Sequence, residues 1–120
     1  MILILDDEPH FVAAYQEVLE IEGFEVSLSK DEEEFFTILG AAVPEAVIID
    51  IMLTSGYDAG LNIYTRFRHM YPDIPTILLT NREDLKTGSD IDKFTKILCK
   101  RDVTPMDLVD NINSLFAKRD

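Results

Sequence analysis

Short β-rich runs alternate with amphipathic helical stretches about five times along the chain, and this alternation constrains the fold more than any other feature. It is typical of a parallel sheet with helices on both faces. The candidate strands are Ile2–Leu5, Glu25–Leu28, Ala46–Ile49, Thr76–Leu79 and Thr95–Leu98. The pattern predicts an α/β, flavodoxin-like, doubly wound fold with a five-stranded parallel sheet in the order 2-1-3-4-5 and five helices.

The helical stretches carry their own start and stop signals. The first pattern ends before Gly23, Asp31 is placed to cap the second, and Pro72 closes the third. Thr104 is followed by a proline and, three positions on, by an acidic residue, which indicates the N-terminus of the last helix. The stretch Glu83–Lys93 is polar and interrupted by a glycine, so it is the weakest helix candidate.

Length and composition limit the class of protein. A chain of 120 residues, 47% of them hydrophobic, predicts a single globular domain over residues 1–120. A net charge of −12 disfavours direct binding to nucleic acid or to a membrane surface. The sequence contains no apolar run long enough to span a membrane and no signal-peptide pattern. With Cys99 as its one cysteine it forms no internal disulfide, so we expect a cytoplasmic protein.

Polar residues follow directly upon four of the apolar strands. Asp6 and Asp7 follow the first, Asp50 the third, Thr80 the fourth and Lys100 the fifth. Because ligands of such sheets bind at the carboxyl ends of the strands, these side chains are the candidate site. A second lysine, Lys96, lies inside the last strand pattern, and Lys100 is therefore preferred.

These residue types suit phosphoryl transfer. Three carboxylates held together repel one another and need a counter-charge, which Mg²⁺ or the Lys100 ammonium can supply. A carboxylate can also accept a phosphoryl group as an aspartyl phosphate. Transfer then depends on positioning and on neutralising the phosphoryl oxygens, to which Mg²⁺, Lys100 and the Thr80 hydroxyl can each contribute.

Four motifs in this order resemble the response-regulator receiver family of two-component signalling, over essentially the whole chain. They are Leu5-Asp6-Asp7-Glu8, Ile48-Ile49-Asp50-Ile51-Met52-Leu53, Leu79-Thr80 and Leu98-Cys99-Lys100. The resemblance implies that Asp6, Asp7, Asp50 and the backbone carbonyl of Met52 bind Mg²⁺. It further implies that Asp50 is the phosphoacceptor and that Thr80 and Lys100 contact the phosphoryl oxygens.

The resemblance also implies the partners. A histidine kinase or phosphotransfer protein would donate the phosphoryl group, and a downstream protein or a fused output domain would receive the signal, with a homodimer as one further form. Such a protein is a phosphoacceptor switch rather than an enzyme acting on a separate substrate. The last residues, 117–120, end near a helix terminus, which leaves open a stand-alone regulator or a receiver that belongs to a longer protein.

The chain departs from the family pattern at several positions. Arg101 replaces the usual proline after the lysine, and Ile97 replaces the usual aromatic residue three positions before it. The segment 53–60 is longer than usual and lacks its common proline. Met52 and Arg82 match positions that flank the path of the attacking water in the family, and they predict slow autodephosphorylation.

Three other functions are weighed against this one. The departures at Ile97 and Arg101 are compatible with a degenerate receiver that acts as a phosphate-independent adaptor. A phosphatase of the haloacid dehalogenase type is disfavoured because Met52 stands where its second acid would be. A flavodoxin is disfavoured because Asp6 and Asp7 would repel the flavin phosphate.

Overall fold

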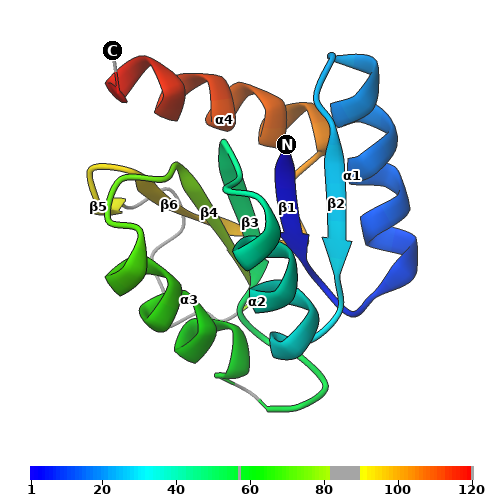
Figure 1. Ribbon diagram of the computed structural model, residues 1–120. Coiled ribbons are helices and arrows are strands. Elements are labelled where there is room, and N and C mark those ends of the chain that lie inside the picture. The colour runs from blue at the N-terminus through cyan, green and yellow to red at the C-terminus, as the bar shows by residue number, and fades with distance from the viewer. Residues whose placement is uncertain (57, 82–89, 120) are drawn as a thin grey trace.

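A six-stranded sheet forms the centre of the molecule, and helices cover both of its faces (Figure 1). The computed structural model describes residues 1–56, 58–81 and 90–119. The strands are β1 (Ile2–Leu5), β2 (Val26–Ser29), β3 (Ala46–Asp50), β4 (Thr76–Thr80), β5 (Asp90–Asp92) and β6 (Thr95–Cys99). They lie in the order β2-β1-β3-β4-β6-β5, and all except β5 pair in parallel. The predicted five parallel strands and their order are therefore confirmed.

The described residues form four helices with recognisable ends. They are α1 (Pro9–Ile21), α2 (Glu32–Ala41), α3 (Ala59–Met70) and α4 (Pro105–Arg119). Asp31 Oδ1 accepts a hydrogen bond from the Glu34 amide at 2.8 Å, as expected of an N-cap. Thr104 and Asp107 bond each other's backbone N–H, which is a capping box at the start of α4. After α1, Gly23 adopts a φ of 97°, a conformation that side chains disfavour.

The prediction of five helices is wrong for the residues that the structure describes. Residues 90–92, at the end of the weakest helix candidate, form β5, which pairs antiparallel with β6 across a two-residue turn. Asp92 stabilises this turn, since its Oδ1 accepts from the Phe94 amide at 2.8 Å and its Oδ2 accepts from the Tyr64 hydroxyl at 3.0 Å. A helix that packs on a sheet needs an apolar stripe, which a polar segment does not have. A strand at the edge of a sheet can be polar. The rest of that candidate, residues 83–89, lies outside the described part of the chain.

Alternating strand residues supply the core on the two faces of the sheet. Leu3, Leu5, Val47 and Ile49 pack against α2 and α3, while Ile2, Ile4, Ala46 and Ile48 pack against α1 and α4. Successive residues of a strand point to opposite faces, so the continuous apolar runs are buried on both sides. Figure 1 shows the same two layers, with α2 and α3 in front of the sheet.

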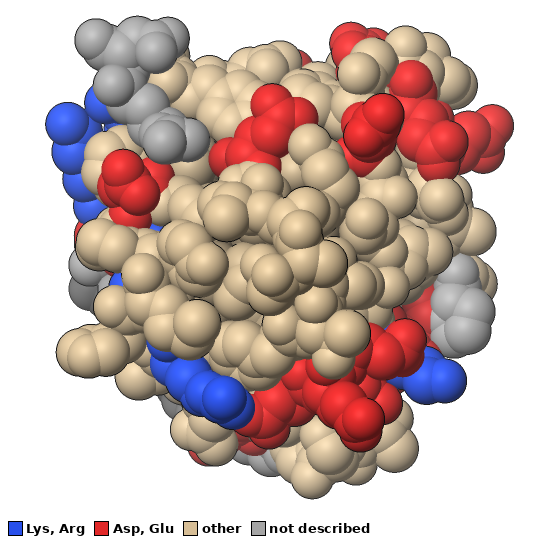
Figure 2. Space-filling model, in the orientation of Figure 1, with Lys and Arg blue, Asp and Glu red and all other residues tan. Residues whose placement is uncertain are grey.

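The parallel strands all end at one edge of the sheet, which places the predicted site. At that edge Leu5 pairs with Ile49, Asp50 with Leu79, and Thr80 with Cys99. On the face in Figure 2, acidic side chains gather over the start of α2, whose first turn contains Glu32, Glu33 and Glu34. Among the described residues, none of the helices combines the length and the hydropathy needed to cross a membrane.

Candidate functional site

Five of the residues predicted for the site meet at the carboxyl edge of the sheet. Asp6 and Asp7 follow β1, Asp50 and Thr80 are the last residues of β3 and β4, and Lys100 follows β6. Apart from Asp7, which is partly exposed, these side chains are buried, with exposed fractions of 5% for Asp6, 2% for Asp50, 1% for Thr80 and 3% for Lys100. Charged residues are almost never this buried unless they are paired, so the arrangement needs an electrostatic explanation.

Three carboxylates form a cluster that suits a hard divalent cation. Asp6, Asp7 and Asp50 each offer one oxygen, and these oxygens all lie within 4.8 Å of one another. Asp6 Oδ2 is buried and accepts no hydrogen bond from the described residues, although it lies 3.2 Å from the Lys100 ammonium. Mg²⁺ prefers carboxylate oxygens and needs only a few of them, because it keeps several waters. The donor set therefore fits the predicted metal.

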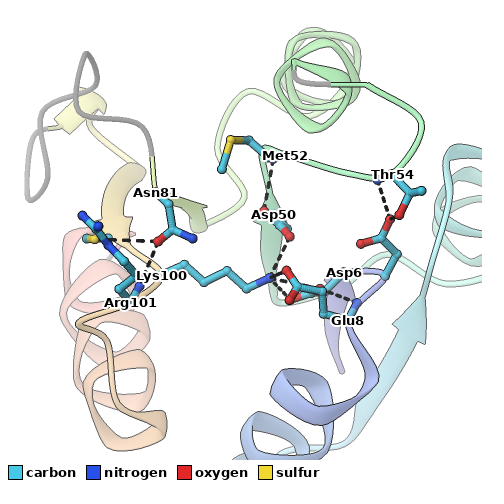
Figure 3. Close-up of polar contacts among 10 residues, drawn as sticks. Asp6, Glu8, Asp50, Met52, Thr54, Asn81, Lys100 and Arg101 are labelled. Atoms are coloured by element: carbon cyan, nitrogen blue, oxygen red, sulfur yellow. Dashed lines mark hydrogen bonds and ion pairs between the residues drawn. The ribbon is translucent and has the colours of Figure 1, made fainter.

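Lys100 supplies the positive charge inside this cluster. Its Nζ donates to Asp50 Oδ2 at 2.8 Å and to Asp6 Oδ1 at 3.3 Å, and it also binds Glu8 Oε1 at 2.7 Å (Figure 3). The preference for Lys100 over Lys96 is consistent with this geometry, since Lys96 lies within β6, where it pairs with Ile77. The backbone of Lys100 is held as well, because its amide donates to the Thr80 carbonyl at 2.9 Å.

Burial and pairing shift the acid–base properties of these groups. Burial raises the pKa of Asp50 to about 6, although the Lys100 ammonium partly opposes the shift. Burial also raises the pKa of Asp6, against the effect of a hydrogen bond from the Glu8 amide. Burial alone would lower the pKa of Lys100, but its hydrogen bonds to Asp50 and Glu8 raise that pKa above its ordinary value. The lysine therefore stays charged, and Asp50 is the carboxylate that burial perturbs most clearly.

Asp7 behaves differently from the other two carboxylates. Burial works to raise its pKa, but two hydrogen bonds from Thr54 lower it below the usual value. The Thr54 amide and hydroxyl both donate to Asp7 Oδ2, at 2.6 and 2.5 Å (Figure 3). Asp7 is thus held as a carboxylate by the loop after β3.

Three contacts of the site were not anticipated from the sequence. Glu8 belongs to the acidic motif, but no role was expected for it, and it pairs with Lys100. The Phe11 ring centroid lies 4.7 Å from the Lys100 ammonium, which is a cation–π distance. Thr54 contacts Asp7 across 47 positions of sequence. The position of Glu8 beside the two aspartates was a usable signal, whereas no local pattern connects Thr54 with Asp7.

The replacement of proline by Arg101 has a structural consequence. The Arg101 backbone N–H, a donor that proline lacks, donates to Asn81 Oδ1 at 3.1 Å (Figure 3). Asn81 follows Thr80, so this bond joins the end of β4 to the loop of Lys100. Ile97 is buried in the core below, with 5% of its surface exposed.

The role of Met52 as a metal ligand remains a prediction. The Met52 amide donates to Asp50 Oδ1 at 3.1 Å, which places its backbone next to the Asp50 carboxylate. The part predicted for Arg82 in slow dephosphorylation falls outside the described residues.

Comparison with known proteins identifies the family. Residues 2–98 match the model of the response regulator receiver domain. The chain is 31% identical over 120 residues to the response regulator SaeR of Staphylococcus epidermidis, covering 98% of this chain and 50% of SaeR. It is 26% identical over 87 residues to the nitrogen assimilation regulatory protein NtrX of Azorhizobium caulinodans, covering 72% of this chain and 19% of NtrX. This chain therefore spans half or less of the length of these two relatives.

Solved structures share the fold. A response regulator receiver protein from Sinorhizobium medicae aligns with a TM-score of 0.83 at 22% identity, covering 99% of this chain and 95% of that one. The response regulator TrrA of Thermotoga maritima, solved in complex with Mg²⁺ and BeF, aligns with a TM-score of 0.76 at 25% identity, covering 95% and 96%. The match over residues 2–98, together with the identity to SaeR, places the chain in the response regulator receiver domain family.

Proposed function

We propose that this chain is a phosphorylation-dependent switch that accepts a phosphoryl group on Asp50 from a histidine kinase or a phosphotransfer protein. The observation that carries the proposal is the buried contact of 2.8 Å between Asp50 Oδ2 and the Lys100 ammonium, beside the carboxylates of Asp6 and Asp7. A pair of this kind provides a nucleophile and a cation at one point, which is what phosphoryl transfer to a carboxylate requires.

The proposed reaction is a transfer between two side chains. An Asp50 oxygen attacks the phosphorus of a phosphohistidine, the bond from phosphorus to the imidazole nitrogen breaks, and the imidazole takes up a proton. Lys100 and the Thr80 hydroxyl contact the phosphoryl oxygens of the aspartyl phosphate. Mg²⁺, held by Asp6, Asp7, Asp50 and the Met52 carbonyl, would neutralise further negative charge on those oxygens. The presence of Mg²⁺ and BeF in the TrrA structure supports this assignment.

A small-molecule phosphodonor tests the proposal directly. Incubation with the donor and Mg²⁺ should add the mass of one phosphoryl group to the intact protein, and EDTA should prevent the addition. Asp50→Asn is the matched variant, because it keeps the shape of the side chain and removes the nucleophile. An equal mass gain in Asp50→Asn, or no gain in the wild type, would contradict the proposed acceptor.

The resemblance to receivers also implies a partner-facing surface, made of the last two helices and the strand between them. The described part of this region contains α4, β6 and the edge strand β5. We propose that the signal leaves the site through the Asn81–Arg101 link, which joins the end of β4 to the lysine loop. The receiver of the signal would be a downstream protein or a fused output domain. If a partner bound equally well to phosphorylated and unphosphorylated protein, the adaptor function would replace the switch.

The acyl phosphate is also proposed to decay slowly. Met52 lies next to Asp50, and its side chain packs against the apolar core, so it offers no group to orient an attacking water. Met52→Asn should therefore shorten the lifetime of the phosphorylated protein, as followed by the loss of mass with time. An unchanged lifetime would exclude Met52 as the cause.

A further inference from the structure

The loop after β3 forms a tight turn that lies against the carboxylate cluster. Leu53 and Gly56 exchange two backbone hydrogen bonds, at 3.3 and 3.0 Å, which leaves Thr54 and Ser55 at the tip. Both ends of the turn are anchored. Leu53 is buried in the core, and the Gly56 carbonyl accepts from the Ala59 amide at the start of α3. The longer segment noted in the sequence therefore contains an ordered element at this point.

Thr54 donates two hydrogen bonds to the same oxygen of Asp7. Its amide lies 2.6 Å and its hydroxyl 2.5 Å from Asp7 Oδ2, and these are short distances for hydrogen bonds to a carboxylate. Lys100 contacts the other two members of the cluster, Asp6 and Asp50. The three carboxylates are consequently held from two sides, by the lysine and by the turn.

We propose that Thr54 is a positioning residue for cation binding. It does not touch the cation, but its hydrogen bonds orient the carboxylate of Asp7, which is the metal ligand. This inference rests on the proposed function, in which Asp7 binds Mg²⁺. Two donors occupy the lone pairs of Oδ2, so Oδ1 is the oxygen that Asp7 presents to the cation. Gly56 joins this turn to the start of α3, so cation binding should order both.

The contribution of Thr54 to the affinity for Mg²⁺ can be measured. Hydrogen-bond partners of metal ligands typically change metal affinity by about 10- to 100-fold when they are removed. Thr54→Val removes the hydroxyl donor while it keeps the backbone N–H and the volume of the side chain. We expect Mg²⁺ to bind about tenfold more weakly to this variant, since one of the two donors remains. Thr54→Ser keeps the hydroxyl and should bind Mg²⁺ as the wild type does.

Isothermal titration calorimetry with Mg²⁺ alone tests the inference on the intact chain. Ser55→Ala is the matched control, because Ser55 is exposed on the same turn and makes no hydrogen bond among the described contacts. Urea unfolding in EDTA shows whether each variant is folded. A purely structural role for Thr54 would lower the urea midpoint in EDTA and leave the affinity for Mg²⁺ unchanged, and that result would overturn the proposal.

Phosphodonor labelling separates this inference from the proposed function. In Thr54→Val, saturating Mg²⁺ should restore the wild-type rate of labelling, while the Mg²⁺ concentration for half-maximal labelling rises about tenfold in step with the binding constant. If the wild type neither binds Mg²⁺ nor takes up phosphate, the proposed function fails. If the wild type does both and Thr54→Val binds Mg²⁺ equally well, the inference alone fails.

Discussion

The Lys100 ammonium lies 2.8 Å from Asp50 Oδ2, although a whole strand, β4, lies between β3, which ends at Asp50, and β6, which Lys100 follows. The lysine follows the last residue of β6, and its amide is bonded to the Thr80 carbonyl at the end of β4. From there the side chain extends along the strand ends to the acidic cluster (Figure 3). The charge of Asp50 is thus compensated from within the fold.

Removal of this ammonium should destabilise the metal-free protein. Lys100→Met leaves Asp6 and Asp50 buried beside each other without a counter-charge, and breaking a buried pair costs about 3–5 kcal/mol. The measurement is the free energy of unfolding in urea with EDTA present. Lys96→Met, within β6, is the control and should change stability by less than about 0.5 kcal/mol.

A second substitution shows whether charge is the cause. In Lys100→Met, adding Asp50→Asn should recover part of the lost stability, because it removes one of the uncompensated carboxylates. Equal unfolding free energies for Lys100→Met and the wild type would argue against a buried ion pair.

Gly60 keeps α3 close to the end of β3, where Asp50 lies. A Cβ at this position would lie 1.9 Å from the Asp50 carbonyl oxygen and 2.7 Å from Ile51 Cα, so the helix has to move away if a methyl group is added. Gly60→Ala should destabilise the protein by about 1–3 kcal/mol, as overpacking does, and should slow phosphorylation by displacing Asp50. Thermal unfolding and phosphodonor labelling measure the two effects.

Gly40 provides the matched control for Gly60. It lies in α2, and a Cβ there meets nothing within 4 Å. Gly40→Ala should leave labelling unchanged and stabilise the protein by up to about 1 kcal/mol through its helix propensity. If both alanine variants had the same stability, the close approach of α3 to β3 would be refuted.

Tyr15 should control part of the stability at alkaline pH. Its hydroxyl is buried without a hydrogen-bond partner among the described residues, and burial raises its pKa to about 12 from an ordinary value of about 10. Between these two pH values the unfolded state releases the proton and the folded state keeps it. Stability is therefore complete below about pH 10 and falls by on the order of 2 kcal/mol as the pH rises to about 12.

The Tyr15→Phe variant isolates this effect. The difference between the phenolate absorbance titrations of wild type and variant should show a transition near pH 12, and the variant should lose less stability over the same range. At neutral pH the variant should be about as stable as the wild type or more so, because it removes an unpaired buried hydroxyl. A difference transition near pH 10 would show that Tyr15 is accessible to water.

Much of the fold could be predicted from the spacing of apolar residues and from the residues that start or end helices. Apolar runs such as Ile2–Leu5 predicted buried strands, and Gly23, Asp31 and Thr104 indicated where helices end or begin. The strand at residues 90–92 was missed because three residues of an edge strand have little periodicity, and Asp92 at its end contacts Tyr64 and Arg68, which are distant in the sequence. The residues next to this strand in the sequence do not indicate these distant partners.

The sequence by itself determined the order of the parallel strands through the alternation of strands and helices. It also determined the edge at which Asp6, Asp7, Asp50, Thr80 and Lys100 would lie, because the end of a strand is encoded in adjacent residues. Only the tertiary structure decided that Lys100 binds Glu8 and lies over Phe11, and that Thr54 binds Asp7. These contacts join residues 47 to 92 positions apart. Their energies depend on distance and burial in the folded chain, which no neighbouring residue in the sequence specifies.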